Sequence, residues 1–382
     1  PGRAEDVVHN PEHQALALEA ARAGLVLLKN EGGLLPLRKD LGTIAVIGPN
    51  ADDRLNQLGD YVASVVTQDV TTVLQGIRNT VSPRTRVLHV RGCDVLGTDV
   101  DEIGRARKAA AEADAAVVVV GENEWQKADR RGTSGEGFDA ATLELTGLQE
   151  TLIEAVAATG TPTVVVLING RPLAIRNVAK RVPAILEAWV CGEKGGQAVA
   201  EVLFGDQNPG GKLPVTVPRH AGQLPAYYNA KKSKAYWIEQ GWGRPYADMD
   251  PTPLFPFGHG LSYTTFAYGN LRLSAAALRT SSTLEVSADI ENTGRREGEE
   301  IVQLYVEDVL ATVATPVKSL KGFAKVRLRP GETKTVRFVL TPDDLALFDK
   351  DLKRVVEPGE FRILVGSSSE DIRLKGGFTV TE

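Results

Sequence analysis

A long polar loop that carries several carboxyl groups follows one of the apolar runs of this sequence. The run at 115–120 reads AAVVVV, and the stretch at 121–149 reads GENEWQKADRRGTSGEGFDAATLELTGLQ. Connections between a strand and a helix in α/β proteins usually have about 2–6 residues, and longer ones are often functional. Because this loop contains the carboxyl groups of Glu122 and Glu136, general acid or base catalysis is the first chemistry that it suggests.

Glu136 has glycines on both sides, within the sequence GTSGEG at 132–137. Glycine lets a chain turn sharply, so we expect Glu136 at the tip of the loop. Partial burial against Phe138 and Trp125 would favour the neutral acid, which could then donate a proton. The alternative is a solvated surface glutamate. The spacing differs from the GxSxG nucleophile elbow of serine hydrolases, since Gly135 and Glu136 interrupt that pattern.

Short apolar runs alternate with helical patterns over the first two-thirds of the chain. The runs are rich in β-branched residues and predict strands of a mainly parallel sheet that is buried on both faces, at 43–47, 86–90, 115–120, 163–168 and 183–190. Apolar residues at three- and four-residue spacings predict helices at 71–81, 100–113, 146–158, 172–180 and 196–204. A capping box is expected at Thr146 and Gln149. This alternation predicts an α/β sandwich, in which ligands bind beyond the carboxyl ends of the strands, where the polar loop begins.

The remaining third of the chain has a different character. A stretch rich in proline, glycine and aromatic residues follows Gly205 and predicts an extended connector. After Phe266 the residues alternate apolar and polar between turn signals, which predicts a β-sandwich of immunoglobulin-like size. We therefore divide the chain into an α/β sandwich domain at 1–236, a connector at 237–264 and a β-sandwich at 265–382.

Composition excludes several classes of partner. The net charge of the 382 residues is -5, without a cluster of lysine and arginine, so neither nucleic acid nor an anionic membrane surface is an expected partner. No apolar run approaches the roughly 18 residues of a membrane span, which predicts a soluble chain. The first residues, PGRAEDVVHN, contain no initiator methionine and no signal-peptide pattern, so we expect an internal cut or a mature end.

Histidine and cysteine do not suggest a metal site. The five histidines lack metal-binding spacing, and Cys93 and Cys191 are far apart, which favours free thiols. We expect no cofactor and no required metal ion.

Long segments in a single order resemble glycoside hydrolase family 3. Segments similar to the second domain of that family are AGLVLLKNEGGLLPL at 23–37, IAVIGPNAD at 44–52, SGEGFDAATLELTGLQETLI at 134–153, VVVLINGRPL at 164–173 and AWVCGEKGGQAVAEVLFGDQNPGGKLPVTVPR at 188–219. Segments similar to its fibronectin type III-like end are PLFPFGHGLSYTTF at 253–266, ENTGRREGEEIVQLYVED at 291–308 and KSLKGFAKVRLRPGET at 318–333. The resemblance covers nearly the whole chain and implies that the region at 265–382 is a fibronectin type III-like domain.

The resemblance implies a retaining β-glycosidase that removes single glucose or xylose residues from the non-reducing end of β-linked substrates. In the β-glucosidase and β-xylosidase branch the acid/base is a glutamate on the long loop after the third strand, and the matching SGEGF segment assigns this role to Glu136. Glu122 and Glu144 are the rivals: Glu122 is better placed to support the loop, and Glu144 to cap the next helix. The resemblance also suggests that Tyr61 lies beside the leaving-group sugar, and Trp125 could stack on a sugar face. Packing within the loops is the alternative for both aromatic residues.

A retaining glycosidase needs a second carboxylate, which in this family is an aspartate in an N-terminal (β/α)8 barrel. The resemblance begins after that barrel. We therefore expect the barrel in the same polypeptide or in a separate chain, and little activity without it. The competing hypothesis is a non-catalytic carbohydrate-binding or scaffolding module. The resemblance favours a periplasmic or secreted location over the cytoplasm.

Overall fold

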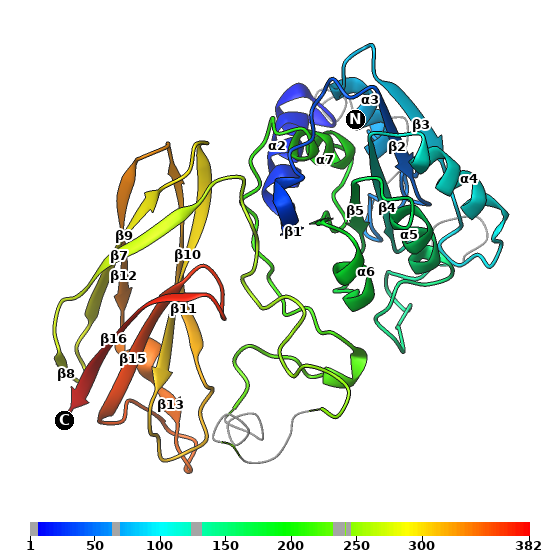
Figure 1. The fold of residues 1–382 in the computed structure, drawn as a ribbon. Helices are drawn as coiled ribbons and strands as arrows, with labels where there is room; N and C mark the ends of the chain where they lie inside the picture. Colours follow the sequence, from blue (N-terminus) through cyan, green and yellow to red (C-terminus); the bar gives the residue numbers. More distant parts are fainter. Residues whose placement is uncertain (1–6, 63–68, 124–131, 232–240, 242–245) are drawn as a thin grey trace. The chain divides into compact units, whose positions relative to one another are not determined.

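The computed structural model describes residues 7–62, 69–123, 132–231, 241 and 246–382 (Figure 1). The chain divides into two compact units. The first extends to Gly211 and includes Arg219–Gly222, and the second comprises Lys212–Pro218 and Gln223–Glu382. The domain boundary predicted at residue 236 lies outside the described residues, so the three-part division stays a prediction.

A six-stranded sheet forms the centre of the first unit, with the strand order β1, β6, β5, β4, β2, β3. Strands β2 to β6 pair in parallel, and β1 pairs antiparallel to β6 at one edge. The strands are β1 (Val26–Asn30), β2 (Thr43–Ile47), β3 (Arg86–Val90), β4 (Ala115–Gly121), β5 (Thr163–Ile168) and β6 (Ala184–Glu187). The five predicted apolar runs correspond to β2 to β6, and β1 is an additional edge strand.

Helices cover the sheet in two groups (Figure 1). Helices α2 and α3 both pack on α7, whereas α4 and α6 both pack on α5. The helices are α2 (Pro11–Gly24), α3 (Val73–Thr80), α4 (Asp101–Ala111), α5 (Gln149–Ala157), α6 (Arg176–Arg181) and α7 (Gly195–Leu203), with 3-10 turns at Glu31–Gly33 and Ala221–Gln223. The predicted α/β architecture with a mainly parallel sheet is confirmed. Among the described residues, no helix combines the length and the apolar character that crossing a membrane would require.

The capping box predicted at the start of α5 is wrong. The N-cap of α5 is Leu148, which has no capping side chain, and the Thr146 hydroxyl bonds instead to the carbonyl of Val95. The buried Gln149 side chain turns toward the sheet: its Oε1 accepts from Gly121 N at 2.8 Å and its Nε2 donates to Gly121 O at 2.9 Å. Satisfying the buried end of β4 takes precedence over capping the helix. A capping box does occur at α3, between Thr72 and Gln75.

The last residue of β4 must be glycine. Gly121 has a φ of 138°, and a Cβ atom at this position would lie 1.9 Å from the carbonyl oxygen of Ile168. Because Gly121 has no Cβ atom, the backbone at the end of β4 can pack closely against the end of β5. The polar loop therefore begins at a fixed point beyond the carboxyl ends of the strands.

The second unit is a β-sandwich. A five-stranded sheet with the order β11, β10, β15, β16, β8 faces a three-stranded sheet with the order β12, β9, β7, around a shared apolar core. The strands are β7 (Phe266–Leu273), β8 (Ala277–Arg279), β9 (Leu284–Asn292), β10 (Gly298–Asp308), β11 (Ser319–Leu328), β12 (Thr333–Leu340), β15 (Gly359–Gly366) and β16 (Ile372–Thr381), with helix α9 (Pro342–Leu345) and a hairpin of β13 (Leu347–Phe348) and β14 (Arg354–Val355). The predicted fibronectin type III-like β-sandwich is confirmed.

Candidate active site

The polar loop closes on itself soon after it leaves β4. The carbonyl of Asn123 accepts from the backbone N–H groups of Thr133 at 3.0 Å and Ser134 at 3.3 Å. In return, the Thr133 hydroxyl accepts from Asn123 N at 3.0 Å. The outgoing and returning segments are thus tied together, and the residues after Thr133 start from a fixed base.

The returning segment makes a tight turn that has Glu136 at its tip. Phe138 N donates to Gly135 O at 3.2 Å, and the φ of 81° at Gly137 is the value that a type II turn requires at its third position. Glu136 is exposed and Phe138 is half-buried. The tip position agrees with the sequence analysis, but the expected partial burial of Glu136 is not seen, since both Glu136 and Gly137 are exposed.

A second segment, which follows β2, reaches this tip. Asp60 Oδ2 accepts from the backbone N–H of Glu136 at 2.7 Å, and the Tyr61 hydroxyl donates to Glu136 Oε2 at 2.9 Å. The bond to Glu136 raises the pKa of Tyr61, because the carboxylate holds the phenolic proton. The Tyr61 side chain is 84% exposed. The structure thus brings two of the three predicted site residues together, while the third, Trp125, lies outside the described residues.

Buried amides hold the segment that carries Asp60 and Tyr61. Asn56 Nδ2 donates to Asn50 Oδ1 at 2.6 Å, and Asn50 Nδ2 donates to the carbonyl of Glu122 at 3.0 Å. Both asparagines are almost fully buried, so these bonds are shielded from water. The segment after β2 and the loop after β4 therefore share an anchor at Glu122.

The Glu122 side chain supports the loop from below, as the sequence analysis expected for this rival. It is 7% exposed; its Oε2 accepts from Gly170 N at 2.9 Å, and its Oε1 forms an ion pair with the guanidinium Nε of Arg171 at 2.9 Å. Burial raises the pKa of Glu122, and the bonds from Gly170 and Arg171 oppose that rise. Arg171 in turn donates through one NH2 group to the carbonyls of Thr133 at 2.9 Å and Phe138 at 2.8 Å.

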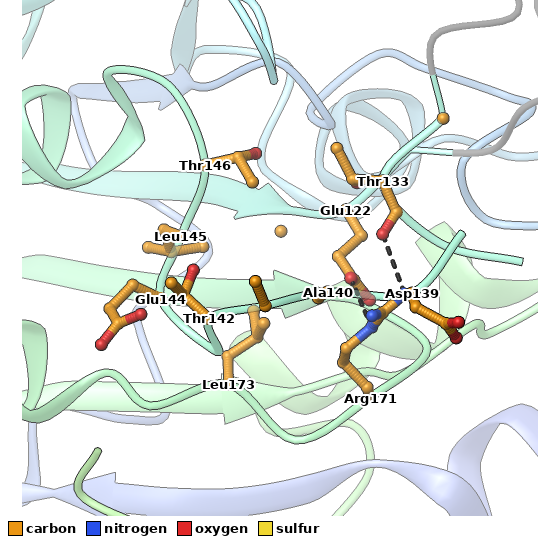
Figure 2. Close-up of a pocket in the computed structure, with 13 residues that line it drawn as sticks. Glu122, Thr133, Asp139, Ala140, Thr142, Glu144, Leu145, Thr146, Arg171 and Leu173 are labelled. Carbon is orange, nitrogen blue, oxygen red and sulfur yellow. Dashed lines mark hydrogen bonds and ion pairs between the residues drawn. The ribbon is translucent and has the colours of Figure 1, made fainter. Parts of the chain in front are cut away.

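A pocket of about 270 Å³ lies at the base of the loop (Figure 2). Glu122, Thr133 and Arg171 line one part of it, and Glu144 and Leu173 line another. Among the described residues that line the pocket, neither Glu136 nor Tyr61 is found. The pocket therefore belongs to the supporting structure and not to the tip.

Glu144, the other rival, does not cap α5. It lies five residues before that helix, and its Oε1 is 3.7 Å from His220 Nε2. Within the described part of the chain, no group of three or more histidine, cysteine, aspartate or glutamate side chains could hold a metal ion.

A buried carboxyl group that the sequence analysis missed lies at the end of β6. Glu187 is 1% exposed, and its Oε1 accepts from Trp189 N at 2.9 Å. Asn169 Nδ2 lies 3.4 Å from Glu187 Oε2. Burial raises the pKa of Glu187 to about 8. Trp189 has a φ of 54°, which is rare for a bulky residue, so the bond that Trp189 N donates to Glu187 stabilises an unusual backbone conformation. The place of Glu187 within the predicted apolar run at 183–190 was the available signal.

Comparison with known proteins identifies the class to which this fold belongs. The family model described as the glycosyl hydrolase family 3 C-terminal domain matches residues 25–263, and a fibronectin type III-like domain matches residues 300–369. The chain belongs to glycoside hydrolase family 3.

Curated relatives match almost the whole chain. A beta-xylosidase of Formosa agariphila is 44% identical over 95% of the chain and 50% of its own length. A periplasmic beta-glucosidase of Salmonella typhimurium is 38% identical over 99% of the chain and 52% of its own length. The crystal structure of a beta-glucosidase from Listeria innocua in complex with glucose has a TM-score of 0.89 at 33% identity, over 98% of this chain and 51% of that one. The chain thus spans about half the length of the relatives that it matches.

Proposed function

We propose that this chain supplies the general acid/base, Glu136, of a retaining exo-acting β-glycosidase. The contact between Tyr61 and Glu136 carries the proposal, because it orients an otherwise exposed carboxyl group at the tip of a turn. In the first step Glu136 protonates the departing glycosidic oxygen. In the second step it removes a proton from the water that releases the sugar.

A separate part of the enzyme provides the nucleophile. Retaining glycosidases place their two carboxyl groups about 5–5.5 Å apart on either side of the glycosidic bond. We propose that a (β/α)8 barrel, in the same or a separate chain, brings an aspartate to this distance from Glu136 and binds the sugar. The exposure of Glu136 and Tyr61 supports this proposal, since an acid that acts on a substrate held elsewhere has to be accessible.

The substrates that we propose are β-glucosides or β-xylosides, after the names of the two curated relatives. The stacking role of Trp125 and the contact of Tyr61 with the leaving-group sugar belong to the same proposal. The periplasmic location named for the Salmonella relative supports a periplasmic or secreted parent protein.

Hydrolysis of p-nitrophenyl β-glucoside and β-xyloside tests the proposal. The chain alone, the chain with its barrel, and the Glu136→Ala form of that pair are compared, each with and without azide. We expect turnover only with the barrel and a loss of at least about 100-fold in kcat for Glu136→Ala. Azide should restore part of the rate, because it attacks the glycosyl-enzyme without a general base and yields a β-glycosyl azide.

The other outcomes point elsewhere. Full activity of Glu136→Ala would refute the assignment and turn attention to Glu122. Turnover by the chain alone would refute the need for the barrel. Sugar binding without hydrolysis by the chain and its barrel would favour a non-catalytic carbohydrate-binding module.

A further inference from the structure

Arg171 connects the sheet to both sides of the turn that carries Glu136. Its guanidinium contacts Glu122 Oε1 and donates to the carbonyl of Thr133 (Figure 2), and it also donates to the carbonyl of Phe138. Thr133 lies three residues before Glu136, and Phe138 lies two residues after it. One side chain therefore fixes the entry and the exit of the turn.

This connection requires the shape of an arginine side chain. The planar guanidinium offers five N–H donors in a fixed fork, so it can bond to a carboxylate and to two carbonyls at once. A lysine ammonium could still pair with Glu122, but its compact group lacks the reach to hold both carbonyls. The turn itself contains two glycines with positive φ, Gly135 and Gly137, which leave the backbone flexible without outside support.

The buried carboxylate of Glu122 holds the arginine in place. Gly170 N and Arg171 contact different oxygens of Glu122, so the backbone bond from Gly170 orients the carboxylate toward the guanidinium. Gly170 is also packed closely, since a Cβ atom there would lie 2.6 Å from the hydroxyl oxygen of Ser134. The returning segment of the loop thus rests directly on the end of β5.

We propose that Arg171, oriented by Glu122, is a positioning residue for proton transfer by Glu136. The inference rests on the proposed function of Glu136 and adds two residues that would act through the turn and not directly on the substrate. Misplacement of a reacting group by about 1 Å can lower a rate by about 100-fold, so a loosened turn should affect the step that needs the acid.

The leaving group of the substrate separates positioning from a purely structural role. The kcat/KM of a retaining glycosidase reports the first step, in which a poor leaving group needs the proton from the acid and 2,4-dinitrophenolate does not. Arg171→Lys in the chain together with its barrel is therefore compared on phenyl and 2,4-dinitrophenyl glycosides. Arg181→Lys is the matched control, because Arg181 also pairs with a glutamate in the same unit, at 2.9 Å from Glu154 Oε1, but on the surface of α6.

We expect Arg171→Lys to lower kcat/KM by about 10- to 100-fold for the phenyl glycoside and by less than about twofold for the dinitrophenyl glycoside. Arg181→Lys should leave both values unchanged. An equal loss on both substrates would overturn the proposal, because it would indicate a smaller folded fraction. Unchanged activity of Arg171→Lys on the phenyl glycoside would also overturn it.

Two further variants keep the test decisive. Glu122→Gln loses the charge and sets its amide NH2 against one of the two donors, Gly170 N or Arg171, so it should show a loss with the same dependence on the leaving group. It replaces Arg171→Lys if that variant fails to fold. Glu136→Ala separates the two proposals. If its loss of kcat/KM depends on the leaving group and that of Arg171→Lys does not, only the positioning role of Arg171 is refuted. Full activity of Glu136→Ala refutes both proposals.

Discussion

Glu187→Gln should make the stability of the α/β unit less sensitive to pH. The wild-type carboxyl group is buried at the end of β6, and burial raises its pKa from 4.5 to about 8. Asn169 Nδ2 lies 3.4 Å from Glu187 Oε2, and Trp189 N donates to Glu187 Oε1. A glutamine has one oxygen that can accept from Trp189 N, and it carries no titratable proton.

The sign of the effect follows from the protons bound in each state. Between pH 4.5 and about 8 the folded protein holds a proton on Glu187 that the unfolded chain has released. The free energy of unfolding therefore falls as the pH rises through this interval. The contribution is complete below about pH 4.5 and lost above about pH 8. At about 1.4 kcal/mol for each pH unit, the interval corresponds to roughly 5 kcal/mol.

Urea denaturation at pH 5, 6, 7 and 8, followed by tryptophan fluorescence, measures the effect. The glutamine variant keeps an acceptor for Trp189 N and is neutral at every pH. Its advantage over the wild type should grow by roughly 3–4 kcal/mol between pH 5 and pH 8. Other titrating groups are common to both proteins, so the difference isolates position 187. A difference that stays constant with pH would refute the reasoning.

Two further changes test other contacts. Lys212→Met should destabilise the β-sandwich unit by about 3 kcal/mol, because it leaves the carboxylate of Glu300 buried without the ammonium that lies 3.1 Å away, and the two side chains are only 10% and 5% exposed. In thermal unfolding, the double variant Lys212→Met with Glu300→Gln should recover much of the stability that Lys212→Met loses. Strictly additive effects of the two changes on stability would contradict the pairing. Tyr61→Phe should lower kcat/KM by about 2- to 10-fold on phenyl glycosides, through loss of the bond to Glu136. An equal effect on dinitrophenyl glycosides would argue against that contact.

Local pattern was sufficient to predict most of the sheet. The runs that became β4 and β5 are buried along their whole length, and such strands have near-continuous apolar sequences. The start of α5 was harder, because Thr146 and Gln149 fit a capping box locally but bond to Val95 and Gly121 in the fold. Those partners are distant in sequence, and no short-range rule includes them.

The site shows the same division between local and distant information. The glycines beside Glu136 predicted its place at the tip of a turn, and the turn at Gly135 and Gly137 agrees with that prediction. The sequence also offered Glu122 and Tyr61 as residues of interest. Nothing in the sequence indicated that Arg171 would bond to the loop, and the place of Glu187 within the apolar run at 183–190 was the available signal of its burial.

The sequence by itself determined the alternation of strands and helices from β2 to α7, the β-sandwich that follows them, the membership of glycoside hydrolase family 3 and the place of Glu136 in a glycine-rich turn. These follow from periodicity, turn residues and matched segments, which are local properties of the chain. Only the tertiary structure decided that Tyr61 meets Glu136 and that Arg171 joins Glu122 to the loop. The parallel pairing of β2, β4 and β5 brings their carboxyl ends to one edge of the sheet, where residues distant in sequence become neighbours.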